Sequence, residues 1–301
     1  MKLDFLEEIL ICVAMVGIIV KKEANGLTLL NIKDIYGNLN SIMDKLKIEL
    51  YTCTWNEEFQ LPFALQYWQR LITPESELKC TVFDNMSDDR TLDILSQYDW
   101  ITVKQFDTNG EMNEDVLTYI RNNCWKGSKA DWVMMVDLDE VFYAKDIISE
   151  LQKMKQQGVA VVACQWYALI GDDVPTYRDD MLLHQQIGRA YKQRMNHRQG
   201  QGDFGKLQLF DPKKVSTMNY SVGMHIAYPD APIMPNFSIY QIHFDKGYGI
   251  QWKIQKRREL WDRMAMSQKQ KGYGYEYGWD DEKMIAEYNE KINQSFNITE
   301  L

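Results

Sequence analysis

The acidic run Asp137-Leu138-Asp139-Glu140 is the part of the sequence whose residue types and spacing point most directly to chemistry. Asp137 and Asp139 are two positions apart, so in an extended segment both side chains point to the same side. Carboxylates are ligands that Mg²⁺ and Mn²⁺ prefer, commonly together with phosphate oxygens of a substrate. The apolar stretch 132–136 precedes the run and is typical of a strand buried on both faces. We therefore expect a divalent cation, Mn²⁺ or Mg²⁺, at the end of a buried strand.

The same segment also fits a phosphatase of the haloacid dehalogenase type, in which D-x-D-x-V follows an apolar strand. There Asp137 would be the nucleophile that forms a phospho-aspartate, and Asp139 the acid/base. Asp172 and Asp173 could supply the later acidic motif of such an enzyme. Against this alternative, three predicted strands precede a motif that usually opens that fold, and only one strand separates the two acidic motifs.

The elements that must position these residues alternate between strand-like and helix-like patterns from residue 47 onward. This alternation predicts a parallel sheet covered by helices, an α/β fold. The strands are expected at 47–54, 80–83, 101–106, 132–136 and 159–164, and the helices at 61–71, after 87–89, at 116–124 and at 147–155. In such sheets ligands bind outside the carboxyl ends of the strands. Polar clusters follow four of these ends, at 56–58, 84–85, 107 and 137–140.

The remaining segments are expected to complete one domain over residues 47–270. The half from 166 to 270 is rich in glycine and aromatic residues, with strands at 206–210 and 237–243 and a basic helix at 250–266. No linker of Pro, Gly and Ser divides it from the half at 47–165, so both should share one sheet. Residues 271–301 are expected to form a C-terminal tail. Residues 1–46 are expected to be a helical extension, whose apolar run 9–20 is shorter than the ~20 residues that span a bilayer. A peripheral contact of this extension with a membrane is one of its expected roles.

Composition limits the classes of function. The chain has 301 residues, of which 45% are hydrophobic and 26% charged, which is ordinary for a soluble globular protein. The net charge of −9 argues against nucleic acid as a partner. It leaves open a phosphate ester bound through a metal, because the metal supplies the positive charge. The five cysteines include no CxxC pair, so we expect neither a zinc site nor a disulfide framework, and a cytoplasmic location.

Three segments taken together resemble the glycosyltransferase family 2-like group, whose members have a GT-A fold. They are Cys53-Thr54-Trp55-Asn56-Glu57-Glu58, the stretch 82–91 with Asp84-Asn85, and the stretch 131–142 with the acidic run. Their order and spacing match over residues 47–165 and more loosely to about 260. The resemblance implies a mostly parallel central sheet flanked by helices, with a nucleotide-sugar half at 47–165 and a smaller acceptor-side half at 166–270.

The resemblance also implies an activity and a set of site residues. The activity is metal-dependent transfer of a sugar from a nucleotide-diphosphate donor, a UDP-sugar before a GDP-sugar, to a glycan, lipid-linked or protein-linked acceptor. Asp139 would ligate the metal, Asp137 would approach the ribose or the metal, and Glu140 would orient the site or bind sugar hydroxyls. The residues that would bind the nucleotide are Thr54, Asn56, Glu57, Asp84 and Asn85.

The second half supplies the remaining candidates. His243 is expected as a third metal ligand, with His225 as the runner-up. Lys246 is expected to contact the diphosphate, with Lys253, Arg257 and Arg258 on the basic helix as the alternative. Asp172 and Asp173 follow the fifth strand and are the candidates for the base that deprotonates the acceptor in an inverting transfer. A GT-A domain that only binds carbohydrate remains an alternative, which the intact Asp137 and Asp139 disfavour.

Overall fold

The computed structural model describes residues 19–23, 26–30, 45–193 and 204–301. The chain divides into two units, Met1–Lys45 and Leu46–Leu301. In the first unit β1 (Ile19–Glu23) and β2 (Gly26–Leu30) form an antiparallel pair. The expected helix is therefore wrong for these residues, where β-branched side chains favour strands and Gly26 favours a turn. Most of the apolar run and the helical pattern at 35–46 lie outside the described residues.

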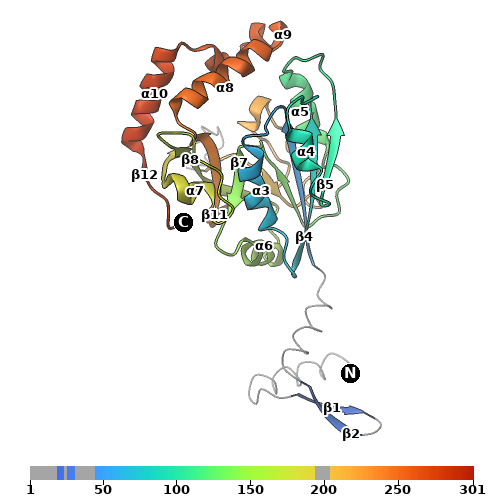
Figure 1. Ribbon diagram of the computed structural model, residues 1–301. Helices are drawn as coiled ribbons and strands as arrows, with labels where there is room; N and C mark the ends of the chain where they lie inside the picture. Colours follow the sequence, from blue (N-terminus) through green and yellow to red (C-terminus); the bar gives the residue numbers. More distant parts are fainter. Residues whose placement is uncertain (1–18, 24–25, 31–44, 194–203) are drawn as a thin grey trace. The chain divides into compact units, whose positions relative to one another are not determined.

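The second unit is built on a mixed sheet whose core is parallel. Its strands run in the order β5-β4-β3-β6, and all three neighbouring pairs are parallel. This confirms the predicted α/β fold, and Figure 1 shows the helices that connect these strands on either side of the sheet. The elements are β3 (Leu46–Thr54), α3 (Leu61–Gln69), β4 (Ser76–Asp84), α4 (Thr91–Leu95), β5 (Ile101–Gln105), α5 (Glu114–Asn123) and β6 (Trp132–Met135).

Beyond β6 the sheet continues with mostly antiparallel neighbours. Its order is β12-β9-β8-β10-β6, and β10 is antiparallel to both β6 and β8. The long strand β11 pairs parallel with β8 and antiparallel with β7. The strands are β7 (Glu140–Tyr143), β8 (Val161–Ile170), β9 (Arg189–Gln193), β10 (Leu209–Phe210), β11 (Ile233–Lys246) and β12 (Phe296–Asn297). The helices are α6 (Ile147–Gln156), α7 (Leu183–Ile187), α8 (Ile250–Arg263), α9 (Met266–Gln270) and α10 (Asp281–Gln294), with short 3₁₀ turns η1 (Val222–Met224) and η2 (Tyr275–Gly278).

The strand before the acidic run is buried on both of its faces. Trp132 and Met134 pack in the larger core cluster, which contains α3 and α6. Val133 and Met135 pack in a second cluster on the other side. All four residues of β6 are buried, as the apolar run predicted. The acidic run therefore follows a strand that is buried at every position.

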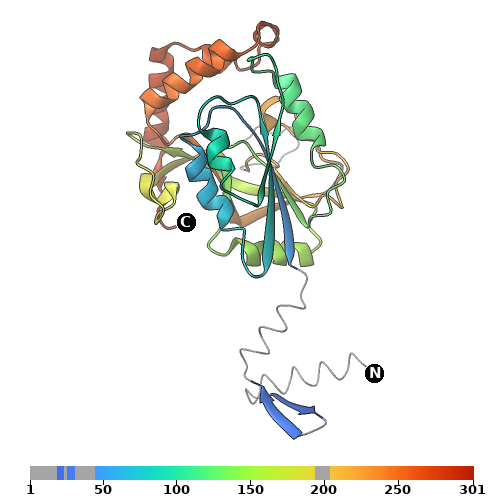
Figure 2. The same cartoon turned by 45° about the vertical axis from the view of Figure 1, so that its right-hand side comes forward.

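The C-terminal helices lie across the end of the sheet where the parallel strands terminate. In Figures 1 and 2, α8 and α10 arch over this end. The backbone N–H of Met112 donates to the carbonyl of Arg263 at 2.8 Å, which ties the end of α8 to the loop after β5. Segment 271–301, expected to be a tail, contributes α10 and pairs β12 with β9 in the main sheet. No helix among the described residues is long and apolar enough to cross a membrane.

Candidate active site

A cavity of about 930 Å³ lies between the carboxyl ends of β3 and β6 and the helices α8 and α10. Its volume is near the upper end of the range for small-molecule sites. Most of its polar lining is charged, with cations from α8 on one wall and the acidic run on another. The charged lining residues are Glu57, Glu114, Arg121, Asp137, Asp139, Glu140, Lys192, Lys206, Asp245, Lys246, Lys253, Lys256, Arg257, Arg263, Glu276, Glu287 and Lys291.

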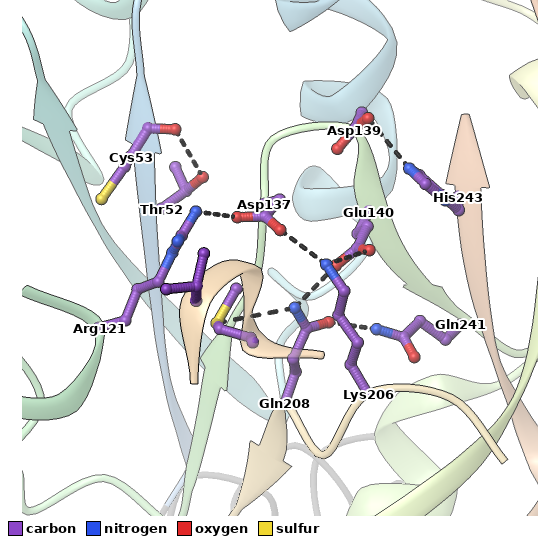
Figure 3. A network of polar contacts seen from close by, with 12 residues as sticks. Thr52, Cys53, Arg121, Asp137, Asp139, Glu140, Lys206, Gln208, Gln241 and His243 are labelled. Atoms are coloured by element: carbon purple, nitrogen blue, oxygen red, sulfur yellow. Dashed lines mark hydrogen bonds and ion pairs between the residues drawn. The ribbon is translucent and has the colours of Figure 1, made fainter. Parts of the chain in front are cut away.

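Asp137 is held by two buried cations. Its Oδ1 accepts a hydrogen bond from Arg121 on α5 at 2.7 Å, and its Oδ2 accepts one from Lys206 at 2.8 Å (Figure 3). Burial by itself raises the pKa of Asp137, but the charges of Arg121 and Lys206 outweigh it and lower the pKa. Both carboxylate oxygens therefore have close partners, which differs from the metal-ligand role expected for this residue.

Lys206 also lies 2.8 Å from a carboxylate oxygen of Glu140, which is completely buried. The other oxygen of Glu140 accepts a hydrogen bond from Gln208 at 2.7 Å. Burial, helped by the neighbouring Asp137, raises the pKa of Glu140, and Lys206 opposes this. Burial lowers the pKa of Lys206, but Asp137 and Glu140 outweigh it and raise the pKa. One lysine thus holds two carboxylates of the acidic run in place.

Asp139 and His243 meet across 104 residues of sequence. Strand β11 pairs with β7 so that His243 lies opposite Glu140, and Nε2 of His243 comes to 3.1 Å from Oδ2 of Asp139. The other ring nitrogen, Nδ1, lies 3.0 Å from Oε1 of Gln193 on β9. Burial lowers the pKa of His243, but the charge and hydrogen bond of Asp139 outweigh it and raise the pKa. The side chains of Asp139 and His243 are 32% and 17% exposed, so both can be reached from the cavity.

These contacts fit a divalent cation. When Nδ1 of His243 donates to Gln193, the neutral ring presents a lone pair on Nε2 to the Asp139 carboxylate, and a cation between the two acceptors would satisfy both. Metal-bound histidines almost always donate their other ring N–H to an acceptor in this way. Within the described part of the chain, no three His, Cys, Asp or Glu side chains converge as a closed metal site. A cation held by Asp139 and His243 would therefore keep positions for water and phosphate oxygens, as is usual for Mg²⁺.

The residues expected to bind the nucleotide are only partly brought together. Thr54, Glu57 and Asn85 line the cavity. The Glu57 carboxylate lies 2.9 Å from Nζ of Lys256, and burial raises its pKa against the effect of that lysine. Asp84 is completely buried and does not line the cavity.

Asn56 and Asp84 instead hold the strand-end loops. The Asn56 amide exchanges two hydrogen bonds with Asp88, one through the side chain and one through the backbone of Asp88. One oxygen of Asp84 accepts from the backbone N–H of Ser87, and its Oδ1 has no hydrogen-bond partner among the described residues. Both residues therefore fix the loops that follow β3 and β4.

Arg263 and Trp55 form a stacked pair beside the loops that follow β3 and β4. The guanidinium of Arg263 lies 3.8 Å from the ring centroid of Trp55, within cation–π range. Arg263 also donates to the backbone carbonyls of Asn85 and Gly110. Burial lowers the pKa of Arg263 to about 10. This arginine therefore connects α8 with the loops that follow three of the parallel strands.

The other predicted site residues have mixed outcomes. His225 and Lys246 line the cavity, and burial, with the nearby Lys206, lowers the pKa of His225 to about 4. Asp172 and Asp173 are exposed and lie outside the lining residues. Asp172 forms an ion pair with Arg189 at 2.5 Å, on the surface. The two predicted bases therefore do not line the cavity that contains Asp139.

Sequence reasoning missed Arg121, Lys206 and Gln193. Lys206 and Gln208 alternate with leucines in a segment that was expected to be a strand, and polar residues at alternate positions of a buried strand would have been a usable signal. Arg121 is a single basic residue on an amphipathic helix, and Gln193 is a single amide at a strand end. Neither carries a local signal, because its role depends on which segments pack against it.

Comparison with known proteins agrees with this geometry. The profile of the family described as Glycosyl transferase family 2 matches residues 50–216, which is more than half of the chain. The chain therefore belongs to glycosyl transferase family 2. This confirms the predicted family, and the α/β fold with its parallel core is the GT-A arrangement expected of it.

A search of curated proteins finds no match. Among solved structures, S. aureus TarS 1–349 in complex with UDP is 21% identical, over 43% of this chain and 38% of that one, with a TM-score of 0.35. A second structure, described as S. aureus TarS 1–349, is 13% identical over 72% of this chain and 66% of that chain, with a TM-score of 0.42. Mannosyltransferase PcManGT from Pyrobaculum calidifontis, in complex with GDP-Man and Mn²⁺, is 13% identical over 72% of this chain and 63% of that chain, with a TM-score of 0.41. The chain thus spans less than two thirds of each of these proteins, and the likeness is too low to transfer a residue role.

Proposed function

We propose that this chain transfers a sugar, of hexose type, from a nucleotide-diphosphate sugar to a carbohydrate-containing acceptor with the help of Mn²⁺ or Mg²⁺. A UDP-sugar is the first donor to test, and the acceptor is a glycan, free or linked to lipid or protein. The observation that carries the proposal is the meeting of Asp139 and His243 at 3.1 Å in a cavity at the ends of the parallel strands. Family membership and the position of ligand sites in α/β sheets agree with it.

The residues of the chain would divide the work as follows. Asp139 and His243 would hold the cation, which when bound neutralises charge on the diphosphate leaving group. Lys246 and Lys256, which line the cavity, would add positive charge near the diphosphate. Thr54, Trp55 and Asn85 would border the nucleoside. Asp137, held by Arg121 and Lys206, would offer a fixed carboxylate edge toward the ribose.

The phosphatase alternative conflicts with the family assignment. It also requires Asp137 to act as a nucleophile, and both of its oxygens are held by cations that lower its pKa and its basicity. The alternative of a domain that only binds carbohydrate makes a different prediction in solution, because it needs neither nucleotide nor metal.

The test is the thermal stability of the purified chain with UDP or GDP, each with and without Mn²⁺. A ligand that binds the native state raises the melting temperature. We expect a metal-dependent rise that Asp139→Ala abolishes. Asp172→Ala, which changes an exposed carboxylate outside the cavity, serves as the control and should keep the rise. Absence of any nucleotide effect in the wild-type protein would reject the proposal.

A further inference from the structure

Arg257 on α8 is a buried cation that makes no hydrogen bond among the described residues, and its guanidinium lies 5.7 Å from the ring centroid of Trp279. It is 6% exposed, yet its nearest carboxylate oxygens, from Glu287 and Glu276, are 3.7 and 3.9 Å away. Its guanidinium makes no hydrogen bond with any described residue, and its Nε is completely buried. A buried charge that lacks close hydrogen-bonded partners is destabilising. Such a group at the wall of a cavity indicates a missing anionic partner.

The charges around Arg257 differ in how closely they are paired. Asp245 is fully occupied, since it accepts from Tyr191 at 2.5 Å and lies 2.8 and 2.7 Å from Lys246 and Lys253. Glu287 is the remaining partly buried carboxylate, and it is 3.5 Å from Lys246. Lys246, Lys253, Arg257, Asp245 and Glu287 are called the Arg257 cluster below. With Glu276, which lies 3.9 Å from Arg257, the three cations face three carboxylates, and Arg257 is the cation whose carboxylate partners are most distant.

Because the cluster lines the same cavity as Asp139 and His243, its ligand would be held beside the reaction centre. Lys253 and Arg257 are four residues apart and therefore share the face of α8 that turns to the cavity. A guanidinium with free N–H groups suits two oxygens of one anion. The cluster is carried by β11, α8 and α10, which lie outside the segment 50–216 matched by the family profile.

We infer that Arg257 and Lys253 of this cluster form a subsite for an oxyanion on the acceptor, a phosphodiester or a carboxylate, separate from the donor diphosphate, to which Lys246 is assigned. This inference rests on the proposed function, because it assigns the acceptor side of the same cavity. An oxyanion would supply the hydrogen bonds that the Arg257 guanidinium lacks among the described residues. The acceptor class would then be an acidic or phosphate-containing glycan, and a neutral sugar would bind less well.

The test uses thermal stability of the full chain in EDTA, with sodium phosphate or sodium acetate as the probe and sodium chloride of equal ionic strength as the reference. We expect phosphate, acetate or both to raise the melting temperature of the wild-type protein, by about 2–4 °C at ten times the dissociation constant. The probe that gives the larger rise indicates whether the acceptor group is a phosphodiester or a carboxylate. Arg257→Gln should abolish the rise.

Arg258→Gln is the matched control, because Arg258 is the next residue on α8, is exposed and pairs with Asp281 away from the cavity. It should keep the rise. A second measurement separates a binding role from a structural one. Without a probe, Arg257→Gln should be at least as stable as the wild-type protein, whereas loss of a structural ion pair would lower its melting temperature.

Two results would overturn the inference while leaving the proposed function intact. One is the absence of any rise in the wild-type protein with either anion. The other is loss of the UDP and Mn²⁺ effect in Arg257→Gln, which would assign the cluster to the diphosphate of the donor. Failure of the proposed function is recognised differently, since it removes the UDP and Mn²⁺ effect from the wild-type protein itself.

Discussion

Two groups of charges in one cavity differ in how closely they are paired. Around Asp137, the cations Arg121 and Lys206 lie 2.7 and 2.8 Å from carboxylate oxygens, and Lys206 reaches Glu140 at the same distance. Around Arg257, the nearest carboxylate oxygen is 3.7 Å away. Both groups are buried, so the difference does not come from exposure to solvent.

The groups around Asp137 and Arg257 are two different kinds of polar site. A buried network in which every charge has a close partner is held rigidly and can fix the position of neighbouring ligands. A buried cation with distant partners gains its stabilisation when an anion binds. On the proposed function, the first kind would position Asp139 for the donor and its metal. The second kind is suited to a ligand that arrives and leaves.

The largest effect should come from breaking the close pairing at Asp137. Lys206→Met removes the cation shared by Asp137 and Glu140 and leaves two buried carboxylates with one counter-charge. We expect the free energy of unfolding to fall by about 3–5 kcal/mol, the usual result of removing one partner from a buried ion pair. Urea unfolding followed by circular dichroism measures this.

Lys214→Met is the control for that prediction. Lys214 pairs with Asp211 at 3.2 Å, and its side chain is 38% exposed. Exposed pairs contribute about 0–1 kcal/mol, so its loss should be small. Equal losses in Lys206→Met and Lys214→Met would show that the Asp137 network is no tighter than a surface pair, and the comparison would fail.

The second prediction concerns the contact that orients His243. Gln193→Ala removes the acceptor 3.0 Å from Nδ1 while leaving Asp139 and His243 unchanged. Partners of this kind typically change metal affinity by about 10–100-fold. We expect a loss of that size in the apparent Mn²⁺ affinity, read from the melting temperature during a Mn²⁺ titration with UDP present. Gln156→Ala, at the exposed end of α6, should not change it. Unchanged Mn²⁺ affinity in Gln193→Ala would argue against His243 as a metal ligand.

A smaller effect should come from His184, a buried group that has no carboxylate partner in the part of the chain that the structure describes. Its Nδ1 lies 2.8 Å from the hydroxyl of Tyr67, and its ring lies 4.5 Å from that of Tyr143. Burial, with a smaller contribution from Arg70, lowers its pKa to about 4. The folded protein therefore binds this proton less well than the unfolded chain does, and the stabilisation is complete above pH 6.5 and lost as the pH falls toward 4.

For the wild-type protein, His184 should lower the free energy of unfolding by about 2 kcal/mol between pH 7.5 and pH 5. His184→Gln should remove that part of the pH dependence, as measured by urea unfolding at the two pH values. An identical pH dependence in both proteins would show that His184 is not buried as a neutral ring. Such a result would also argue against the inference that the buried charge of Arg257 is destabilising.

Much of the framework could be predicted from local patterns. The strand before the acidic run was recognisable because a strand buried on both faces is apolar at every position, as in 132–136. The predicted helices at 61–71 and 147–155 correspond to α3 and α6 because their apolar positions recur with the helical period. The antiparallel additions to the sheet were less predictable, since β10 has only two residues and pairs with strands distant in sequence.

The sequence by itself determined the parallel sheet, the polar residues at its strand ends and the position of the acidic run, because each depends on periodicity within a few residues. Only the tertiary structure decided what those residues face. It brought His243 to Asp139, paired Asp137 with Arg121 and Lys206, and left Asp172 on the surface. It also buried Arg257 with no hydrogen bond among the described residues. These outcomes depend on strand register and on the packing of α8 and α10 across the sheet, and pairing between charges requires distances of a few ångströms that no local pattern encodes.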